Sequence, residues 1–112
     1  MSMSVEMQGP TFLIEPAHRI DFSNGTGGRI DCSAHGSPPP TIDWLTGDGS
    51  VVSDVAGLRE SERNGSLIFP PFPAEHYRHD IHNTIYRCRA SNTMGQVITR
   101  DVHLRAGWYI YF

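Results

Sequence analysis

Short runs of alternating apolar and polar residues recur along most of the chain. Such alternation predicts β-strands that bury one face. The clearest runs are Arg29 to Ala34, Thr41 to Leu45, Ser66 to Phe69, Ile85 to Ala90 and Gln96 to Arg105. The last of them predicts the longest strand. Weaker strand signals lie at Phe12 to Ile14, Arg19 to Phe22, Val51 to Val52 and Leu58 to Glu60.

Turn residues separate these runs. Asn64-Gly65 precedes one strand, and Asn92 to Gly95 predicts a hairpin. The proline in Glu15-Pro16 suits an edge strand that changes its partner. The segment from Ala74 to Asp80 predicts at most one helical turn. Many short strands joined by turns, without an internal repeat, predict an all-β fold with two packed layers.

The two ends of the chain differ from its middle. Residues 1 to 8 (MSMSVEMQ) show no periodicity and are interpreted as a leader segment outside the fold. Residues 107 to 112 (GWYIYF) form an apolar tail or the start of a linker. The folded domain is therefore expected to span residues 9 to 106.

Composition narrows the possible functions. The 112 residues are 38% hydrophobic and carry a formal net charge of −3 with no block of basic residues, which disfavours binding to nucleic acid or to an anionic membrane. No apolar run reaches the roughly 18 residues that span a bilayer. The chain also lacks a nucleophile elbow and a phosphate-binding glycine loop. We therefore expect neither an enzyme nor a cofactor.

The two cysteines fall on the inward faces of separate predicted strands. Trp44 follows Cys32, and Tyr86 lies two residues before Cys88. A buried tryptophan beside an inter-sheet disulfide, with a tyrosine two residues before the second cysteine, is typical of immunoglobulin domains. A zinc site needs more clustered ligands, and a catalytic thiol needs exposure. The pattern predicts a Cys32–Cys88 disulfide joining two packed antiparallel sheets, worth about 4 kcal/mol by loop entropy.

A disulfide favours an oxidising compartment, so we expect an extracellular domain. Two N-glycosylation acceptor triplets agree with this location. They are Asn24-Gly25-Thr26 and Asn64-Gly65-Ser66, and both lie in predicted turns. Asn24 and Asn64 are therefore candidate glycosylation sites.

Three histidines recur at intervals of three residues and raise the question of a metal site. His76, His79 and His82 lie beside Glu75 and Asp80. Only two of the three would share a face of so short a helix, and prolines interrupt the segment. We therefore expect a solvated connection and no metal site.

Several motifs carry a resemblance to one receptor family. The residues GSPPPTIDW (Gly36 to Trp44) and ASNTMG (Ala90 to Gly95) resemble the corresponding turns of I-set immunoglobulin domains. LIFPPF and RDVH are more distinctive and resemble the first immunoglobulin domain of invertebrate Down syndrome cell adhesion molecules (Dscam). The resemblance covers Gly9 to Ala106. It implies a single-pass cell-membrane receptor that binds the same receptor on an opposing cell, with neighbouring immunoglobulin domains of its own chain as further partners.

The segment before the second cysteine departs from the common pattern. Most immunoglobulin domains have Asp-x-Gly-x-Tyr-x-Cys, whereas HNTIYRC places His82 and Thr84 at the Asp and Gly positions. The frequent buried ion pair between that Asp and an Arg is therefore not expected. The same departure resembles the Dscam first domain.

Two other function classes remain open from the sequence. A secreted or surface immune-type domain would bind a heterologous protein with the same fold and disulfide. An I-set domain of an intracellular filament protein would keep its two cysteines reduced. In none of the three classes do we expect a small-molecule substrate or direct membrane contact by this domain.

Overall fold

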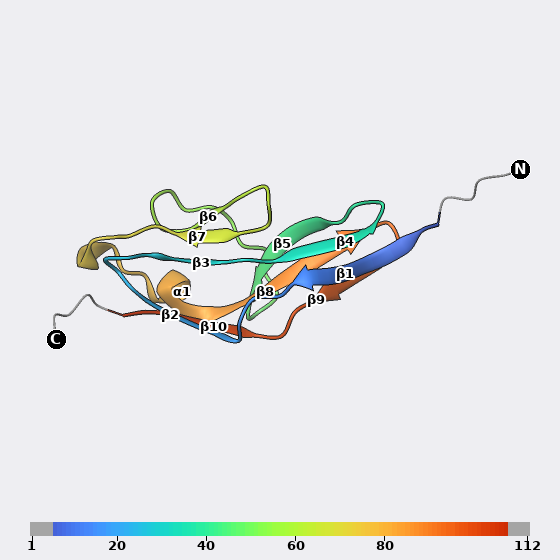
Figure 1. Cartoon of the computed structure of the whole chain (residues 1–112). Helices are drawn as coiled ribbons and strands as arrows, with labels where there is room; N and C mark the ends of the chain where they lie inside the picture. Colours follow the sequence, from blue (N-terminus) through green and yellow to red (C-terminus); the bar gives the residue numbers. More distant parts are fainter. Residues whose placement is uncertain (1–5, 108–112) are drawn as a thin grey trace, which may run out of the picture.

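The computed structural model describes residues 6–107, which form two facing layers of strands (Figure 1). The larger layer has the order β2-β10-β8-β5, with β9 paired to β8. Its strands are β2 (Arg19–Ser23), β5 (Thr41–Thr46), β8 (Asn83–Asn92), β9 (Gly95–Ile98) and β10 (Val102–Gly107). The facing layer consists of the pair β1-β4 and the sheet β3-β7-β6. Its strands are β1 (Gln8–Ile14), β3 (Gly28–Ile30), β4 (Ser33–Ser37), β6 (Glu60–Ser61) and β7 (Leu67–Phe69).

The first two strands lie in different layers. β1 pairs with β4, and after Pro16 the chain crosses to the other sheet, where β2 pairs with β10. The predicted change of partner at Glu15-Pro16 is therefore confirmed. The β2–β10 pair is parallel, which corrects the expectation of purely antiparallel sheets. Because the chain reaches its place beside β10 by crossing between the layers and not by a hairpin, β2 runs in the same direction as β10.

The predicted strand from Arg29 to Ala34 is divided at Cys32. Its first part, β3, pairs with β7, and its second part, β4, pairs with β1. Because the two parts have different neighbours, regular pairing is interrupted where the chain passes from one neighbour to the other. The inward orientation of Ile30 and Cys32 is nevertheless as predicted, since both are buried.

The prediction of one long strand from Gln96 to Arg105 is wrong. The segment forms β9 and β10, and β8 is the longer strand. At the break, the Thr99 N–H donates to the Cys88 carbonyl at 2.9 Å, and the Thr99 hydroxyl accepts from the Cys88 N–H at 2.9 Å. The buried Thr99 side chain thus replaces one backbone hydrogen bond to β8. This replacement leaves the alternation of apolar residues unchanged, so the sequence pattern does not reveal it.

Smaller differences occur in the connections. The helical turn expected between Ala74 and Asp80 is two separate turns, the 3-10 turn η1 (Ala74–His76) and α1 (His79–His82). The weak signal at Val51 is an isolated bridge to Leu45. The strand expected at Leu58 to Glu60 instead begins at Glu60, as β6.

The described ends are part of the sandwich. Gln8, assigned above to the leader, is the first residue of β1, and its carbonyl accepts from Asn92 Nδ2 at 2.8 Å. Gly107, assigned to the tail, ends β10, and its carbonyl accepts from the Asn24 N–H at 3.0 Å. Of the other leader residues, Glu6 and Met7 precede β1 without regular structure. Leader residues 1–5 and tail residues 108–112 lie outside the described part.

The core lies between the two layers. β10 shows how the sequence pattern produces it, because Val102 and Leu104 are buried while His103 and Arg105 between and after them are exposed. The buried cluster contains Ile30, Cys32, Trp44, Leu67, Phe69, Ile81, Tyr86, Cys88, Val102 and Leu104. Both sheets contribute, so the predicted two-layer packing is confirmed.

Candidate interaction surface

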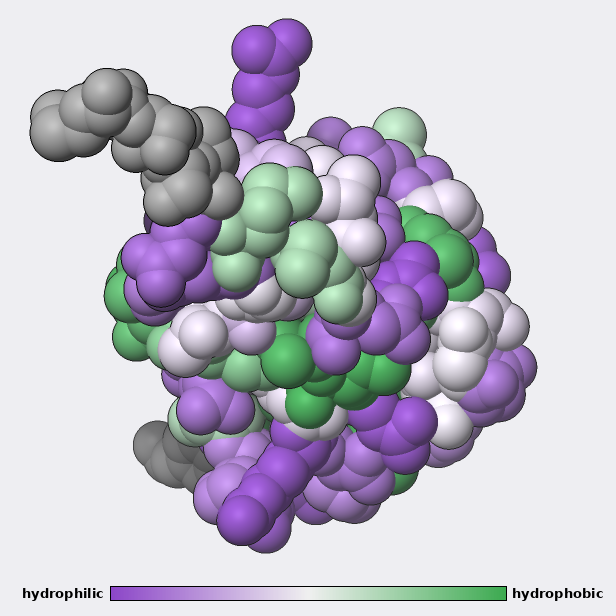
Figure 2. Space-filling view, turned by 90° about the vertical axis from the view of Figure 1, so that its right-hand side faces the viewer, coloured by the Kyte–Doolittle hydropathy of each residue, from purple (hydrophilic) through white to green (hydrophobic). Residues whose placement is uncertain are grey.

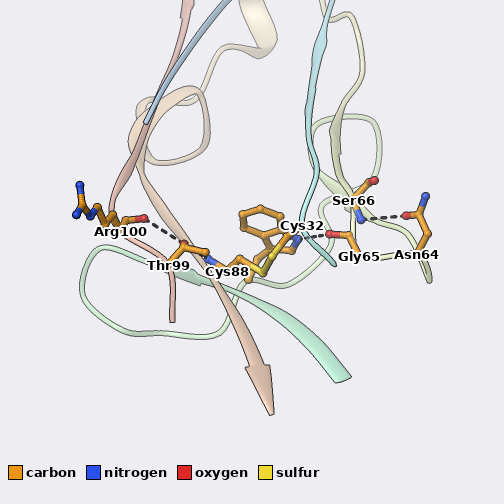
Figure 3. Close-up of a disulfide and its surroundings, with 8 residues drawn as sticks. Cys32, Asn64, Gly65, Ser66, Cys88, Thr99 and Arg100 are labelled. Atoms are coloured by element: carbon orange, nitrogen blue, oxygen red, sulfur yellow. Dashed lines mark hydrogen bonds between the residues drawn. A yellow bond between two sulfur atoms is a disulfide. The ribbon is translucent and has the colours of Figure 1, made fainter. Parts of the chain in front are cut away.

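A disulfide between Cys32 and Cys88 joins the two layers (Figure 3). The two residues are 56 positions apart in the sequence, and both are buried. Trp44 is 3% exposed, and its indole Nε1–H donates to the Gly65 carbonyl at 2.8 Å. The predicted pairing and the predicted burial of the tryptophan are thus both present in the fold.

Tyr86 connects three parts of the core. Its hydroxyl donates to the Ile81 carbonyl at 2.8 Å and accepts from Arg59 Nη1 at 3.2 Å. Burial raises the pKa of Tyr86, and the Arg59 contact only partly opposes the shift. The hydroxyl therefore stays protonated and serves as a structural donor.

Among residues 6–107, no carboxylate forms an ion pair with Arg59, where the common motif would place one. Its guanidinium instead donates to the Ser53 carbonyl at 2.9 and 3.1 Å, in addition to the Tyr86 contact. The sequence pattern does not single out Arg59 as the cation at this position. The sequence pattern around Arg59 resembles that around exposed arginines, so the pattern does not show that Arg59 is buried.

His82 occupies the position of the missing carboxylate and is fully buried. Its imidazole stacks on Phe72 with ring centroids 3.9 Å apart and on Tyr77 at 5.5 Å. Nδ1 accepts from the Arg78 N–H at 2.9 Å, which places the ring proton on Nε2. Burial lowers the pKa of His82, so the neutral ring is the folded form.

The histidine segment is therefore divided between core and solvent. His82 packs inside, whereas His76 and His79 are exposed. Within residues 6–107, no three His, Cys, Asp or Glu side chains gather as metal ligands. The packing of His82 in the core corrects the expectation that the whole segment is a solvated connection.

The outer face of the β2-β10-β8-β5 sheet carries paired charges. Asp21 lies 3.1 Å from Arg19 and 3.7 Å from Arg105, measured between the carboxylate oxygens and the guanidinium Nε atoms. Farther along the sheet, the ion pairs are Arg87 with Asp101 at 2.6 Å and Arg89 with Asp43 at 3.0 Å. Exposed pairs of this kind contribute at most about 1 kcal/mol each. Their arrangement defines a polar surface more than it stabilises the fold.

Two open hollows lie on this charged face. The first is lined by His18, Arg19, Asp21, Asn83, His103, Leu104 and Arg105. The second adjoins it through Asn83 and His103 and extends toward the turn that follows β5. Both hollows are open to solvent and are lined mainly by polar and charged residues.

The end of the molecule at which β1 begins has a different character. Figure 2, which faces this end, shows apolar side chains interrupted by hydrophilic ones. Met7 and Met94 are each about half exposed, at 50% and 51%. Asn92, the last residue of β8 and two residues before Met94, donates to the Gln8 and Pro38 carbonyls and so links β8 to β1 and to the β4–β5 connection.

The two candidate glycosylation sites occupy different surroundings. Asn64 is exposed in the turn between β6 and β7. Asn24 is half buried in the turn between β2 and β3, and its Nδ2 donates to the Phe72 carbonyl at 3.0 Å. Both lie outside the charged outer face.

The comparison with known families decides the classification. Residues 10–104 match the immunoglobulin I-set domain. The chain belongs to the I-set immunoglobulin family. Because this match covers nearly all the described strands, the predicted fold class is confirmed.

The resemblance to Dscam is also confirmed. The I-set chain is 53% identical to cell adhesion molecule Dscam2 of Drosophila melanogaster over 100 residues, which are 89% of the chain and 5% of that protein. It is 35% identical to human DSCAM over 95 residues, which are 85% of the chain and 5% of that protein. A crystal structure of the N-terminal four Ig domains of Dscam1 isoform 7.44 superposes with a TM-score of 0.93 at 49% identity, over 96% of this chain and 28% of that one. The chain therefore spans only a small part of its relatives.

Proposed function

We propose that this I-set domain is part of a Dscam-like cell-adhesion receptor and contributes to homophilic recognition between cells. The observation that carries the proposal is the 53% identity to Dscam2 over 89% of the chain. The partners proposed for the domain are the same receptor on an opposing cell and neighbouring immunoglobulin domains of its own chain.

The position proposed for this domain is the N-terminal end of the receptor, as the first immunoglobulin domain. The superposition on the N-terminal four Ig domains of Dscam1 supports this position. In the arrangement that the resemblance implies, the domain is mainly a scaffold that packs against a later domain of the same chain. Such a scaffold benefits from rigid surfaces, because little entropy is then lost on docking.

An extracellular location follows from the same proposal. The Cys32–Cys88 disulfide supports an oxidising compartment. Within residues 6–107, no helix is long and apolar enough to cross a membrane. The proposed receptor is held in the membrane by a segment other than the residues described.

A binding role, without catalysis, agrees with how the fold uses its buried polar groups. Tyr86 and Arg59 bond to each other and to backbone carbonyls, and His82 is enclosed between aromatic rings. These groups are directed into the core. At the surface, arginine–aspartate ion pairs present charges that are suited to protein recognition.

The surface we assign to contacts within the receptor is the outer face of the β2-β10-β8-β5 sheet. It combines two hollows with the exposed charges of Asp21 and Arg105. Interfaces between domains of one chain are commonly polar. Neither candidate glycosylation site lies on this face.

Bead aggregation with the full receptor ectodomain tests the proposal. Beads carrying the wild-type ectodomain should cluster with each other, and Arg105→Glu should reduce clustering because it places a second negative charge beside Asp21. Glu60→Lys, on the exposed strand β6 of the other layer, is the matched control and should leave clustering unchanged. Beads that cluster only with a different protein would identify a heterophilic binder and refute the homophilic proposal.

Sedimentation equilibrium of the isolated chain tests the scaffold role. Weak or absent self-association is expected, because recognition then depends on further domains. A tight dimer that disappears when residues 108–112 are removed would contradict the scaffold role.

A further inference from the structure

The β6–β7 turn presents one asparagine side chain to solvent on a rigid base. The Glu62 N–H donates to the Ser66 carbonyl at 2.8 Å, and the Gly65 N–H donates to the Glu62 carbonyl at 3.1 Å. Asn64 Oδ1 accepts from the Ser66 N–H at 3.0 Å (Figure 3). Within residues 6–107, this bond occupies the amide oxygen of Asn64 and leaves its Nδ2 without a partner.

The same turn hides the hydroxyl that an N-glycosylation acceptor requires. Ser66 is 3% exposed. Its Oγ donates to Asp31 Oδ1 at 2.6 Å and accepts from Arg29 Nη2 at 2.9 Å, and this hydrogen bond from Ser66 lowers the pKa of Asp31. An oligosaccharide must therefore be attached before β3 and β7 pair, while Ser66 is still accessible. Folding then buries the serine and leaves the modified asparagine outside.

Asn24, in the other acceptor triplet, is held differently. Its Nδ2 donates to the Phe72 carbonyl at 3.0 Å, and its own carbonyl accepts from the Phe72 N–H at 3.0 Å. Phe72 in turn stacks on the buried His82. A sugar on Asn24 Nδ2 would compete with the bond from Nδ2 to the Phe72 carbonyl, whereas a sugar on Asn64 Nδ2 displaces no contact of the described fold.

From these contacts we infer that Asn64 carries an N-linked glycan, and that the folded domain accommodates it without rearrangement. The inference rests on the proposed extracellular function, since the modification occurs in the secretory pathway. In the transfer step, Asn64 Nδ2 forms a bond to C1 of an oligosaccharide carried on a lipid pyrophosphate. The C1–O bond to the pyrophosphate breaks, the lipid pyrophosphate leaves, and Nδ2 loses one proton.

The position of this glycan has a consequence for recognition. The β6–β7 turn lies in the layer opposite β2 and β10 (Figure 1). A glycan there shields the β3-β7-β6 side and leaves the charged outer face of the other sheet open. Protein contacts of the domain are thereby directed to the β2-β10-β8-β5 face.

The test is secretion of the chain from insect or mammalian cells, followed by intact and peptide mass spectrometry. Wild type should carry a glycan at Asn64 that peptide N-glycosidase removes, converting Asn64 to Asp. Asn64→Asp keeps the oxygen that accepts from Ser66 and should abolish this glycan while leaving the melting temperature unchanged. Asn24→Asp is the matched control and should leave the glycan at Asn64 in place.

Secreted wild-type chain with an unmodified Asn64 overturns the inference. Peptide analysis of the wild type gives this answer even where a variant is not secreted. The outcome is distinct from failure of the proposed function: a chain that carries the glycan but whose receptor fails to cluster beads refutes homophilic binding alone. A chain with both thiols free after denaturation and no glycan refutes the extracellular location itself.

Discussion

Gly65 lies at the point where the β6–β7 turn closes over the disulfide. Its φ is +102°, and a Cβ at this residue would lie 2.3 Å from the Cys32 carbonyl oxygen. Its own carbonyl accepts the indole N–H of the buried Trp44. Gly65→Ala therefore forces either the turn or the Cys32 backbone to move by about 1 Å, since carbon–oxygen contacts ordinarily exceed about 3.3 Å.

The expected cost has two contributions. A side chain in the positive-φ region costs about 1–2 kcal/mol. Moving the turn also breaks the Trp44–Gly65 bond and leaves a buried donor unpaired, which costs about 1–3 kcal/mol more. The total of about 2–5 kcal/mol is a large part of the roughly 5–15 kcal/mol by which domains of this size are typically stable.

Gly57→Ala is the matched control for this substitution. Gly57 also has a positive φ, +79°, but no atom lies within 4 Å of the position that a Cβ would take there. It should therefore show only the conformational cost of about 1–2 kcal/mol. Urea unfolding followed by circular dichroism measures both variants. Equal losses of unfolding free energy at the two positions would refute the argument that the close approach to Cys32 requires a glycine.

Three further predictions concern the core. Replacing Cys32 and Cys88 together by Ala should lower the unfolding free energy by about 4 kcal/mol in denaturant titrations, because the loop between them is no longer closed in the unfolded chain; an unchanged midpoint would contradict this. Tyr86→Phe should cost about 1–3 kcal/mol in the same assay, since it removes the donor to Ile81 and the acceptor of the buried guanidinium. His82 should make the fold acid-sensitive, because its pKa is lowered in the folded state. Stability is complete above the unfolded value near 6.5 and decreases by up to about 1.4 kcal/mol per pH unit as the pH falls toward the lowered folded value. His82→Phe should remove this part of the pH dependence of the urea midpoint between pH 7 and pH 5. An identical pH profile in wild type and His82→Phe would show that His82 does not titrate in this range.

The parts of the fold that were predictable from sequence depend on local alternation and on a few specific residues. The disulfide, the buried Trp44 and the inward face of β8 follow from side chains whose burial has one dominant cause, the removal of apolar surface from water. In the alternating run from Ile85 to Ala90, Arg87 and Arg89 fall on the face opposite Tyr86 and Cys88, and both form ion pairs on the outer face. Such features need no knowledge of which strand is the neighbour.

The sequence-based predictions are wrong where a strand changes its pairing partner. The break at Cys32 occurs because the chain exchanges one neighbouring strand for another. The break at Thr99 occurs because the Thr99 hydroxyl replaces a backbone acceptor. Both breaks leave the alternation of apolar residues nearly intact. Likewise, the burial of His82 depends on Phe72 and Tyr77, which approach it through two short helical turns. These are tertiary effects, and the sequence pattern around each residue does not encode them.

The β6–β7 turn joins stability and surface chemistry in adjacent residues. Gly65 is constrained by the core beneath it, through Cys32 and Trp44, while Asn64 faces solvent and contributes only an acceptor to the turn. The two functions should therefore separate by mutation. Gly65→Ala keeps the acceptor triplet and so keeps the glycan on whatever fraction is secreted, but it lowers stability. Asn64→Asp removes the glycan and keeps stability. A glycan lost with Gly65→Ala would show that attachment depends on the closed turn, against the order of events inferred from the buried Ser66 hydroxyl.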